Sequence, residues 1–202
     1  MAAESVQDFK PLFQQIGISL NIWAKVESEL CRVFCACFDS DNASPADQAF
    51  WAVISFEAKL AMVGAVIAAR FNHKPDIRTD WGTIRDALVT RNKLRNKIAH
   101  GTVLRMRVYK KGKPKPSETF LSPYHYARQY KDPPSLEDML KPTYDPRPKE
   151  RLKLADIEQA ARAFSEMRDR VQALWTKVDA IARREAAEMR EGKALPRRQV
   201  DL

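Results

Sequence analysis

Glycine is scarce in this sequence, with only 6 glycines in 202 residues. Loops that cradle phosphates or dinucleotides need several closely spaced glycines, so these nucleotide-binding motifs are excluded. Long apolar runs are missing as well, since the longest mostly apolar stretch, residues 58–69, has about half the length of a membrane-spanning helix. The first residues, Met-Ala-Ala-Glu-Ser, show no basic region followed by an apolar one. We therefore expect a cytoplasmic protein with no membrane association and no cofactor.

Cysteine and histidine are also few, at 3 each. Cys31, Cys35 and Cys37 fall in one predicted helical stretch, where they cannot link distant segments by disulfides. A structural zinc site usually draws its Cys and His ligands from two clusters, and the sequence has no second cluster. We therefore interpret the three cysteines as small buried side chains in a reducing compartment and predict no metal site.

The net charge of +9 is concentrated in the middle of the chain. Residues 91–155 hold 17 Lys and Arg against 6 Asp and Glu, whereas residues 1–90 hold 8 against 11. A basic surface of this density attracts polyanions and speeds their encounter with the protein. A solvated face that only keeps the protein in solution explains the same charge, so charge alone leaves both interpretations open.

Apolar residues recur every three or four positions over four segments, which predicts a mainly α fold. The segments are 16–38; 45–71, with Ser44 as N-cap and Pro45 at the first position; 81–99, capped by Thr79 or Asp80; and 154–189. We expect them to form an antiparallel helical bundle in one domain over residues 1–190. Residues 191–202 are expected to be a disordered tail.

An insertion over residues 102–150 separates the third and the last predicted helix. Residues 102–109 alternate between apolar and polar side chains, and a lysine-rich turn and residues 118–121 follow them. This pattern predicts a small basic β-hairpin. Residues 122–148 hold six of the 12 prolines and predict an irregular arm. The hairpin carries four candidate nucleic-acid contacts, Lys110, Lys111, Lys113 and Lys115.

Several kinds of polar residue lie near the end of the third predicted helix. A helical spacing of about 100° places four apolar residues on one side as the core face. These are Ile84, Ala87, Leu94 and Ile98. An adjoining polar strip holds Asn92, Arg95, Asn96 and His100, flanked by Lys93 and Lys97, with Arg91 nearer the apolar side. A guanidinium, an amide and an imidazole are thus expected within reach of one phosphate.

Each of these residues also has a structural interpretation when taken alone. His100 at a helix end is a suitable partner for the helix dipole, and Arg95 is a suitable surface ion-pair residue. Asn96 is a common helix-ending signal. Arg91 is open to two interpretations, as a dimer-interface residue or as a second phosphate ligand.

The segment Arg95-Asn96-Lys97-Ile98-Ala99-His100-Gly101 resembles the R-x4-H motif of the HEPN superfamily. The resemblance covers roughly residues 16–105 and 155–185, and the order of the helices before the motif agrees with it. It implies a helical fold in which two protomers pack with their motif helices together, so that both copies line one cleft. Some members carry a tyrosine two residues after the motif histidine, as the target of a partner enzyme. Thr102 occupies that position here, so this control is not expected.

The resemblance implies a metal-independent endoribonuclease of the toxin or phage-defence kind. His100 would act as acid or base on the RNA 2′-hydroxyl and the leaving oxygen, Arg95 would stabilise charge on the phosphorus, and Asn96 would orient phosphate or His100. The partners that the resemblance implies are RNA, a second copy of the chain and an antitoxin or defence-system protein. Two alternatives stay open: a non-catalytic HEPN module that binds RNA or a protein, and a structural module whose basic arm docks an acidic protein.

Overall fold

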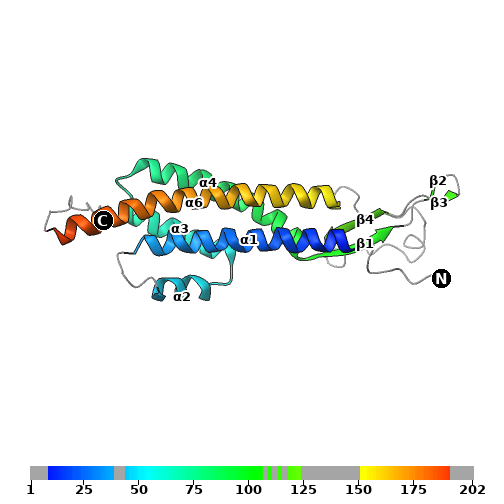
Figure 1. Ribbon diagram of the computed structural model, residues 1–202, viewed down its shortest axis with the longest axis horizontal. Helices are drawn as coiled ribbons and strands as arrows, with labels where there is room; N and C mark the ends of the chain where they lie inside the picture. Colours follow the sequence, from blue (N-terminus) through cyan, green and yellow to red (C-terminus); the bar gives the residue numbers. More distant parts are fainter. Residues whose placement is uncertain are drawn as a thin grey trace, which may run out of the picture. The chain divides into compact units, whose positions relative to one another are not determined.

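The computed structural model describes residues 9–38, 44–106, 109–110, 113–114, 118–123 and 151–191. Most of these residues are helical, and Figure 1 shows the elements along the chain. The helices are α1 (Lys10–Ala36), α2 (Ser44–Ala52), α3 (Phe56–Arg70), α4 (Pro75–Ala99) and α6 (Leu154–Arg190). Strand β1 (Gly101–Met106) pairs antiparallel with β4 (Glu118–Pro123), and β2 (Tyr109–Lys110) with β3 (Lys113–Pro114). The predicted mainly α fold with a small hairpin is confirmed.

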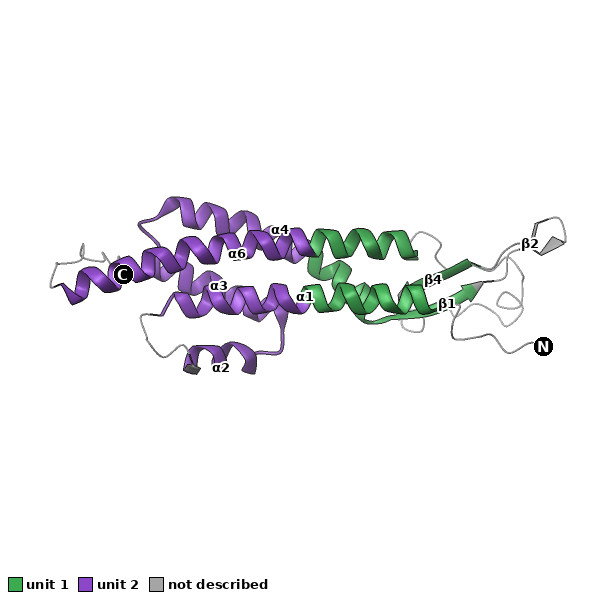
Figure 2. Cartoon of the chain, viewed as in Figure 1, with its two compact units in different colours: residues 1–23, 91–164 green, residues 24–90, 165–202 purple. Residues whose placement is uncertain are grey.

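The chain divides into two compact units (Figure 2). Unit 1 comprises residues 1–23 and 91–164, and unit 2 comprises residues 24–90 and 165–202. Helices α1, α4 and α6 contribute residues to both units, whereas α2 and α3 belong to unit 2 and the strands to unit 1. The single domain expected over residues 1–190 stays a prediction.

In unit 1, α1 and α6 run in the same direction. Ser19 Oγ lies 3.3 Å from the Ile157 carbonyl oxygen, and the rings of Trp23 and Phe164 meet edge to face with centroids 5.0 Å apart. Such an aromatic pair contributes about 0.5–1.5 kcal/mol beyond the burial of its area. All four residues are buried, so this contact forms part of the core of unit 1.

In unit 2, α3 runs parallel to α1. Lys59 Nζ donates to Glu27 Oε2 at 2.8 Å, and farther along both helices Arg70 Nη1 donates to the Cys37 carbonyl at 2.8 Å. Helix α4 runs opposite to α6 within this unit (Figure 1). The antiparallel packing expected from the sequence therefore holds for α4 against α6, but not for α1 against α3 or α6.

The helix expected over residues 45–71 is interrupted, which corrects the sequence prediction. Residues 53–55 are not helical, and Ile54 is 97% exposed. Ser55 caps the new helix, because its hydroxyl accepts a hydrogen bond from the Ala58 N–H at 3.4 Å. Val53 and Ile54 continue the apolar pattern, so periodicity alone does not reveal the break. The chain turns there, which allows α3 to run parallel to α1.

Helix α4 begins earlier than expected. It starts at Pro75 rather than Trp81, because proline lacks the N–H that is unsatisfied anyway at a first helical position. Thr79, expected as a cap, instead lies inside the helix and donates to the Pro75 carbonyl at 2.8 Å. The last predicted helix agrees with α6 to within one residue at its end.

Several predictions fall wholly or largely outside the described residues. These are most of the proline-rich arm over 122–148 and the tail over 191–202. Within the described part of the chain, no helix combines the length and apolarity that crossing a bilayer requires.

Candidate functional site

The last three turns of α4 present a buried side and a cationic side. Leu88, Asn92 and Ile98 are buried and lie on the same side of the helix. Arg91, Leu94, Arg95 and Asn96 are partly exposed, and Lys93, Lys97 and His100 are exposed. Three residues of the predicted polar strip, Arg95, Asn96 and His100, are therefore at least partly accessible to solvent. Residues 91–100 all belong to unit 1.

Asn92 is the exception, and it corrects the sequence prediction. Its exposed fraction is only 4%, because it occupies the core face between Leu88 and Ile98. A side chain this buried is not presented to RNA from solvent, so we remove Asn92 from the candidate RNA contacts. Ala87 and Leu94, expected in the core, are only partly buried. The core face is thus rotated toward Leu88 and Asn92 relative to the face that apolar residues alone predict.

Asn96 connects the other two motif residues. Arg95 Nη1 donates to Asn96 Oδ1 at 3.0 Å, and the His100 backbone N–H donates to the Asn96 carbonyl at 3.0 Å. The first bond fixes the guanidinium beside the amide, and the second continues the helical hydrogen bonding as far as His100. Arg95 Nε is buried and has no hydrogen-bond partner among the described residues. Because Nε is buried, an anion from solvent would reach Arg95 through the terminal nitrogens of its partly exposed guanidinium.

Gly101 allows the chain to enter the sheet directly after His100. A Cβ atom at this position would lie 2.6 Å from Leu121 Cγ and 2.9 Å from the Lys97 carbonyl oxygen, which is closer than real Cβ atoms approach. Leu121 is held in turn by two backbone hydrogen bonds to Leu152, at 2.8 and 2.9 Å. The absence of a side chain at Gly101 therefore permits the close packing of the chain against Leu121 directly after His100.

Residues 91–100, at the end of α4, form the motif turn, which has no acidic partner among the described residues. Residues 91–100 contain four Lys and Arg and no Asp or Glu. In the described part of the chain, none of these cations lies within ion-pair distance of a carboxylate. Several cations elsewhere are paired, as Arg32 is with Glu29 and Arg168 is with Asp169. Cations at a helix C-terminus are favoured by its dipole, and without an acidic partner among the described residues their charge is available to a ligand.

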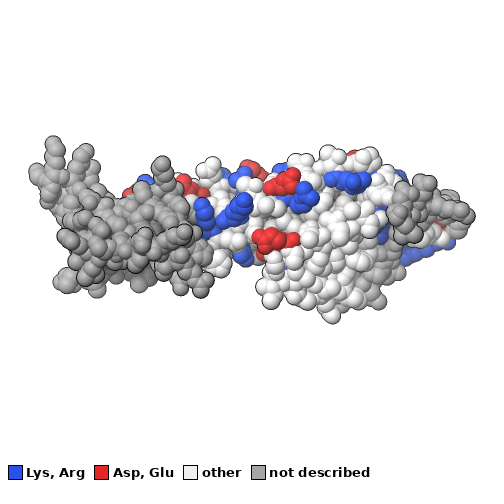
Figure 3. Space-filling view, turned by 180° about the vertical axis from the view of Figure 1, so that it is seen from behind, with Lys and Arg blue, Asp and Glu red and all other residues white. Residues whose placement is uncertain are grey.

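The basic surface predicted for residues 91–155 is described only in part. Figure 3 shows one face of the molecule, on which Lys and Arg are interspersed with Asp and Glu rather than gathered into a patch of one sign. Lys111 and Lys115 lie outside the described residues, and only the backbone strands are given for Lys110 and Lys113. The RNA-binding role of the hairpin lysines stays a prediction.

A second cluster of chemically active side chains lies in unit 2. Cys31 Sγ is 3.9 Å from Cys35 Sγ and donates a hydrogen bond to Asp47 Oδ1 at 3.2 Å. Burial raises the pKa of the Cys31 thiol, and the hydrogen bond to Asp47 raises it further; burial also raises the pKa of Cys35. Cys37 stands apart beside Arg70, and burial raises its pKa to about 12. The sequence reasoning missed Asp47, because it counted only Cys and His as ligands.

Comparison with family models, with curated proteins and with solved structures finds no match to this chain. The resemblance to the HEPN superfamily therefore rests on the motif residues and on the order of the helices.

Proposed function

We propose that this chain is a metal-independent endoribonuclease of the HEPN kind, acting in the cytoplasm as a homodimer. The observation that carries the proposal is the arrangement of Arg95, Asn96 and His100 at the end of α4. A guanidinium held by an amide and an exposed imidazole lie five residues apart in the motif turn, which has no acidic partner among the described residues. These are the groups that cleavage of an RNA phosphodiester by its own 2′-hydroxyl requires.

Each of the three side chains has a separate role in the proposed reaction. A neutral imidazole takes the proton of the 2′-hydroxyl, whose oxygen attacks the neighbouring phosphorus atom. An imidazolium gives a proton to the departing 5′-oxygen, so the products are a 2′,3′-cyclic phosphate and a 5′-hydroxyl. Arg95 donates to the equatorial oxygens as their charge grows, and Asn96 keeps the guanidinium oriented.

A second copy of the chain supplies what one copy lacks. Each copy contributes a single His100, whereas attack and departure occur on opposite sides of the phosphorus and are served best by two imidazoles. Two motif turns facing each other across a two-fold axis would place both around one phosphate. Negative charge on the RNA would also offset the repulsion between two cationic turns.

Incubating the purified chain with RNA in excess EDTA tests the proposal. We expect cleavage, with 2′,3′-cyclic phosphate and 5′-hydroxyl ends on the products. Circular dichroism in the same buffer confirms that the helices persist without metal. Salt-sensitive binding without cleavage would instead support a non-catalytic RNA-binding module built on the same cationic turn. Cleavage that stops in EDTA while the helices persist would contradict the metal-independent reaction.

A further inference from the structure

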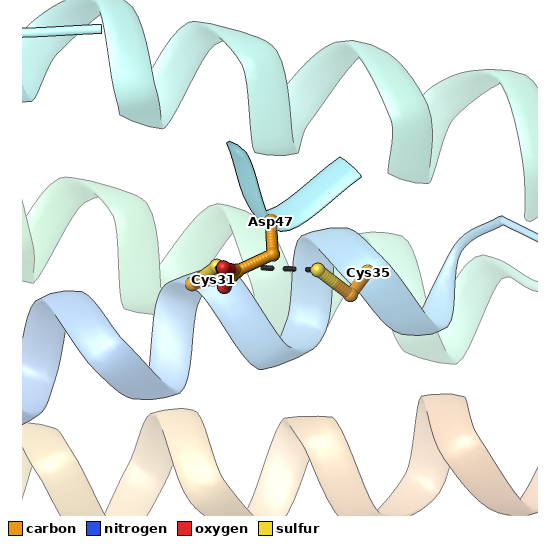
Figure 4. Close-up of side chains that lie close together, drawn as sticks. All are labelled: Cys31, Cys35 and Asp47. Atoms are coloured by element: carbon orange, nitrogen blue, oxygen red, sulfur yellow. Dashed lines mark hydrogen bonds between the residues drawn. The ribbon is translucent and has the colours of Figure 1, made fainter. Parts of the chain in front are cut away.

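Three side chains that bind metals converge where α1 meets α2 in unit 2. Cys31 and Cys35 are one helical turn apart on α1, so their sulfur atoms lie on the same face. Asp47 reaches them from the first turn of α2. Figure 4 shows the two thiols and the carboxylate pointing toward one another, and their ligand atoms all lie within 4.8 Å of one another.

Two of the three distances between these atoms agree with the edges of a zinc tetrahedron. Bond lengths of about 2.3 Å to sulfur and about 2.0–2.2 Å to carboxylate oxygen imply roughly 3.8 Å between two sulfur ligands and roughly 3.5 Å between sulfur and oxygen. The structure has 3.9 Å between Cys31 Sγ and Cys35 Sγ, and 3.2 Å between Cys31 Sγ and Asp47 Oδ1. The third pair, Cys35 Sγ and the Asp47 carboxylate, lies within 4.8 Å, so an ion fits among the three atoms once the carboxylate moves toward Cys35.

Neighbouring residues already orient the carboxylate. Trp51 Nε1 donates to Asp47 Oδ1 at 3.2 Å, from one turn farther along α2. The Lys59 ammonium lies 4.5 Å from the centroid of the Trp51 ring and is itself paired with Glu27. A metal-binding carboxylate is commonly held by an outer hydrogen bond of this kind. The Asp47 side chain is thus positioned by contacts other than its hydrogen bond from Cys31.

We propose that Cys31, Cys35 and Asp47 form a binding site for a thiophilic divalent cation, with Zn²⁺ as the preferred ion. Two sulfur ligands select zinc over magnesium or calcium, which prefer oxygen alone. Binding requires both thiols to release their protons to solvent. Because Asp47 is exposed and Cys35 partly exposed, the fourth ligand is water or an external group. The ion joins the end of α1 to the start of α2.

Titration of the full chain with Co²⁺, after stripping with EDTA and removal of the chelator, tests this site directly. Cobalt replaces zinc in tetrahedral sites, and each bound thiolate gives a charge-transfer absorption. We expect one Co²⁺ per chain with both the thiolate and the tetrahedral visible bands, and loss of both when Zn²⁺ is added. Zn²⁺ should also raise the Tm of the stripped protein.

Matched variants identify the ligands. Cys31→Ser, Cys35→Ser and Asp47→Asn should each weaken Co²⁺ binding by about tenfold or more, since removal of even an outer-shell partner costs 10–100-fold. Asp76→Asn removes the same charge from the first turn of α4 and should change nothing, and Cys37→Ala should keep the bands. The site is wrong if the wild type gives no thiolate band, or if Asp47→Asn binds as tightly as Asp76→Asn. RNA cleavage is measured in a separate assay, because the motif residues belong to unit 1 and the three ligands to unit 2.

Discussion

The guanidinium of Arg95 donates a hydrogen bond from Nη1 to the side-chain oxygen of Asn96 at 3.0 Å. This contact between adjacent residues keeps the cation beside the motif turn without neutralising it, because an amide carries no charge. An arginine paired with a carboxylate would have to exchange that partner before binding a phosphate. The choice of amide at position 96 is therefore a feature of the site that a substitution can test.

Asn96→Asp should lower both RNA affinity and cleavage. The new carboxylate would accept from the same Nη1 atom and form an ion pair with Arg95, so RNA phosphate would compete for the guanidinium. We expect a decrease of about tenfold or more in kcat/KM, which corresponds to about 1.4 kcal/mol. Asn72→Asp, which adds the same charge at an exposed position before α4, serves as the control. Equal activity in both variants would show that Asn96 does not govern the availability of Arg95.

Gly101→Ala should destabilise the fold. The added Cβ would lie 2.6 Å from Leu121 Cγ and 2.9 Å from the Lys97 carbonyl oxygen, and overpacking of this kind costs about 1–3 kcal/mol. Gly82→Ala is the matched control, because a Cβ atom there meets nothing within 4 Å. It should instead stabilise α4 by about 0.5–1 kcal/mol. Urea unfolding measures the free energy of unfolding of both variants. A Gly101→Ala protein as stable as the wild type would show that the close approach at Gly101 does not limit stability.

The lysines of the basic hairpin should contribute to RNA affinity by binding phosphates. Replacing Lys110, Lys111, Lys113 and Lys115 with glutamine should reduce the log–log salt dependence of binding, by up to about 0.7 for each phosphate of a single strand that is no longer bound. Cleavage at saturating RNA should change little. The same removal of charge from Lys25, Lys74, Lys177 and Arg184 is the control and should leave the slope nearly unchanged. Identical salt-dependence slopes for both sets of variants would show that the hairpin lysines do not bind RNA phosphates.

Mixed dimers test whether two motif turns share one site. If they do, a wild-type copy paired with a His100→Ala copy should be nearly inactive. Refolding wild-type chains with an equal amount of the variant leaves about half of them in wild-type pairs, and a nine-fold excess leaves about a tenth. Activity per wild-type copy should fall along this line, once mass spectrometry confirms the exchange of subunits. A constant activity per wild-type copy would mean that each copy has an independent site.

The sequence predicts the helices well where apolar spacing and capping residues agree. Helix α6 and the pairing of β1 with β4 follow from periodicity and from β-branched alternation. The break before Phe56 does not follow, because Val53 and Ile54 continue the apolar pattern. Its available signal is Ser55 followed by Glu57, which is typical of a helix start.

The sequence predicts some residues of the candidate sites and misses others. Arg95, Asn96 and His100 are close in sequence, so a single helix brings them together. The prediction for Asn92 is wrong, because a polar residue on a core face breaks the rule that the face is apolar. The role of Asp47 does not emerge from the sequence, since its approach to Cys31 depends on how the chain turns between α1 and α2. A shared dimer site cannot be read from one chain, because its second half comes from another copy.

The proposed role of His100 in metal-independent RNA cleavage is tested by one comparison. The rate of cleavage in EDTA is measured side by side for the wild type and for His100→Ala. General acid–base groups contribute about 10²–10⁴-fold, so the variant should cleave at least about 10²-fold more slowly. Because His100 is exposed, the variant's helical circular dichroism and Tm should match those of the wild type. Products of the wild type should end in 2′,3′-cyclic phosphate. A folded His100→Ala protein that cleaves RNA as fast as the wild type would contradict the account.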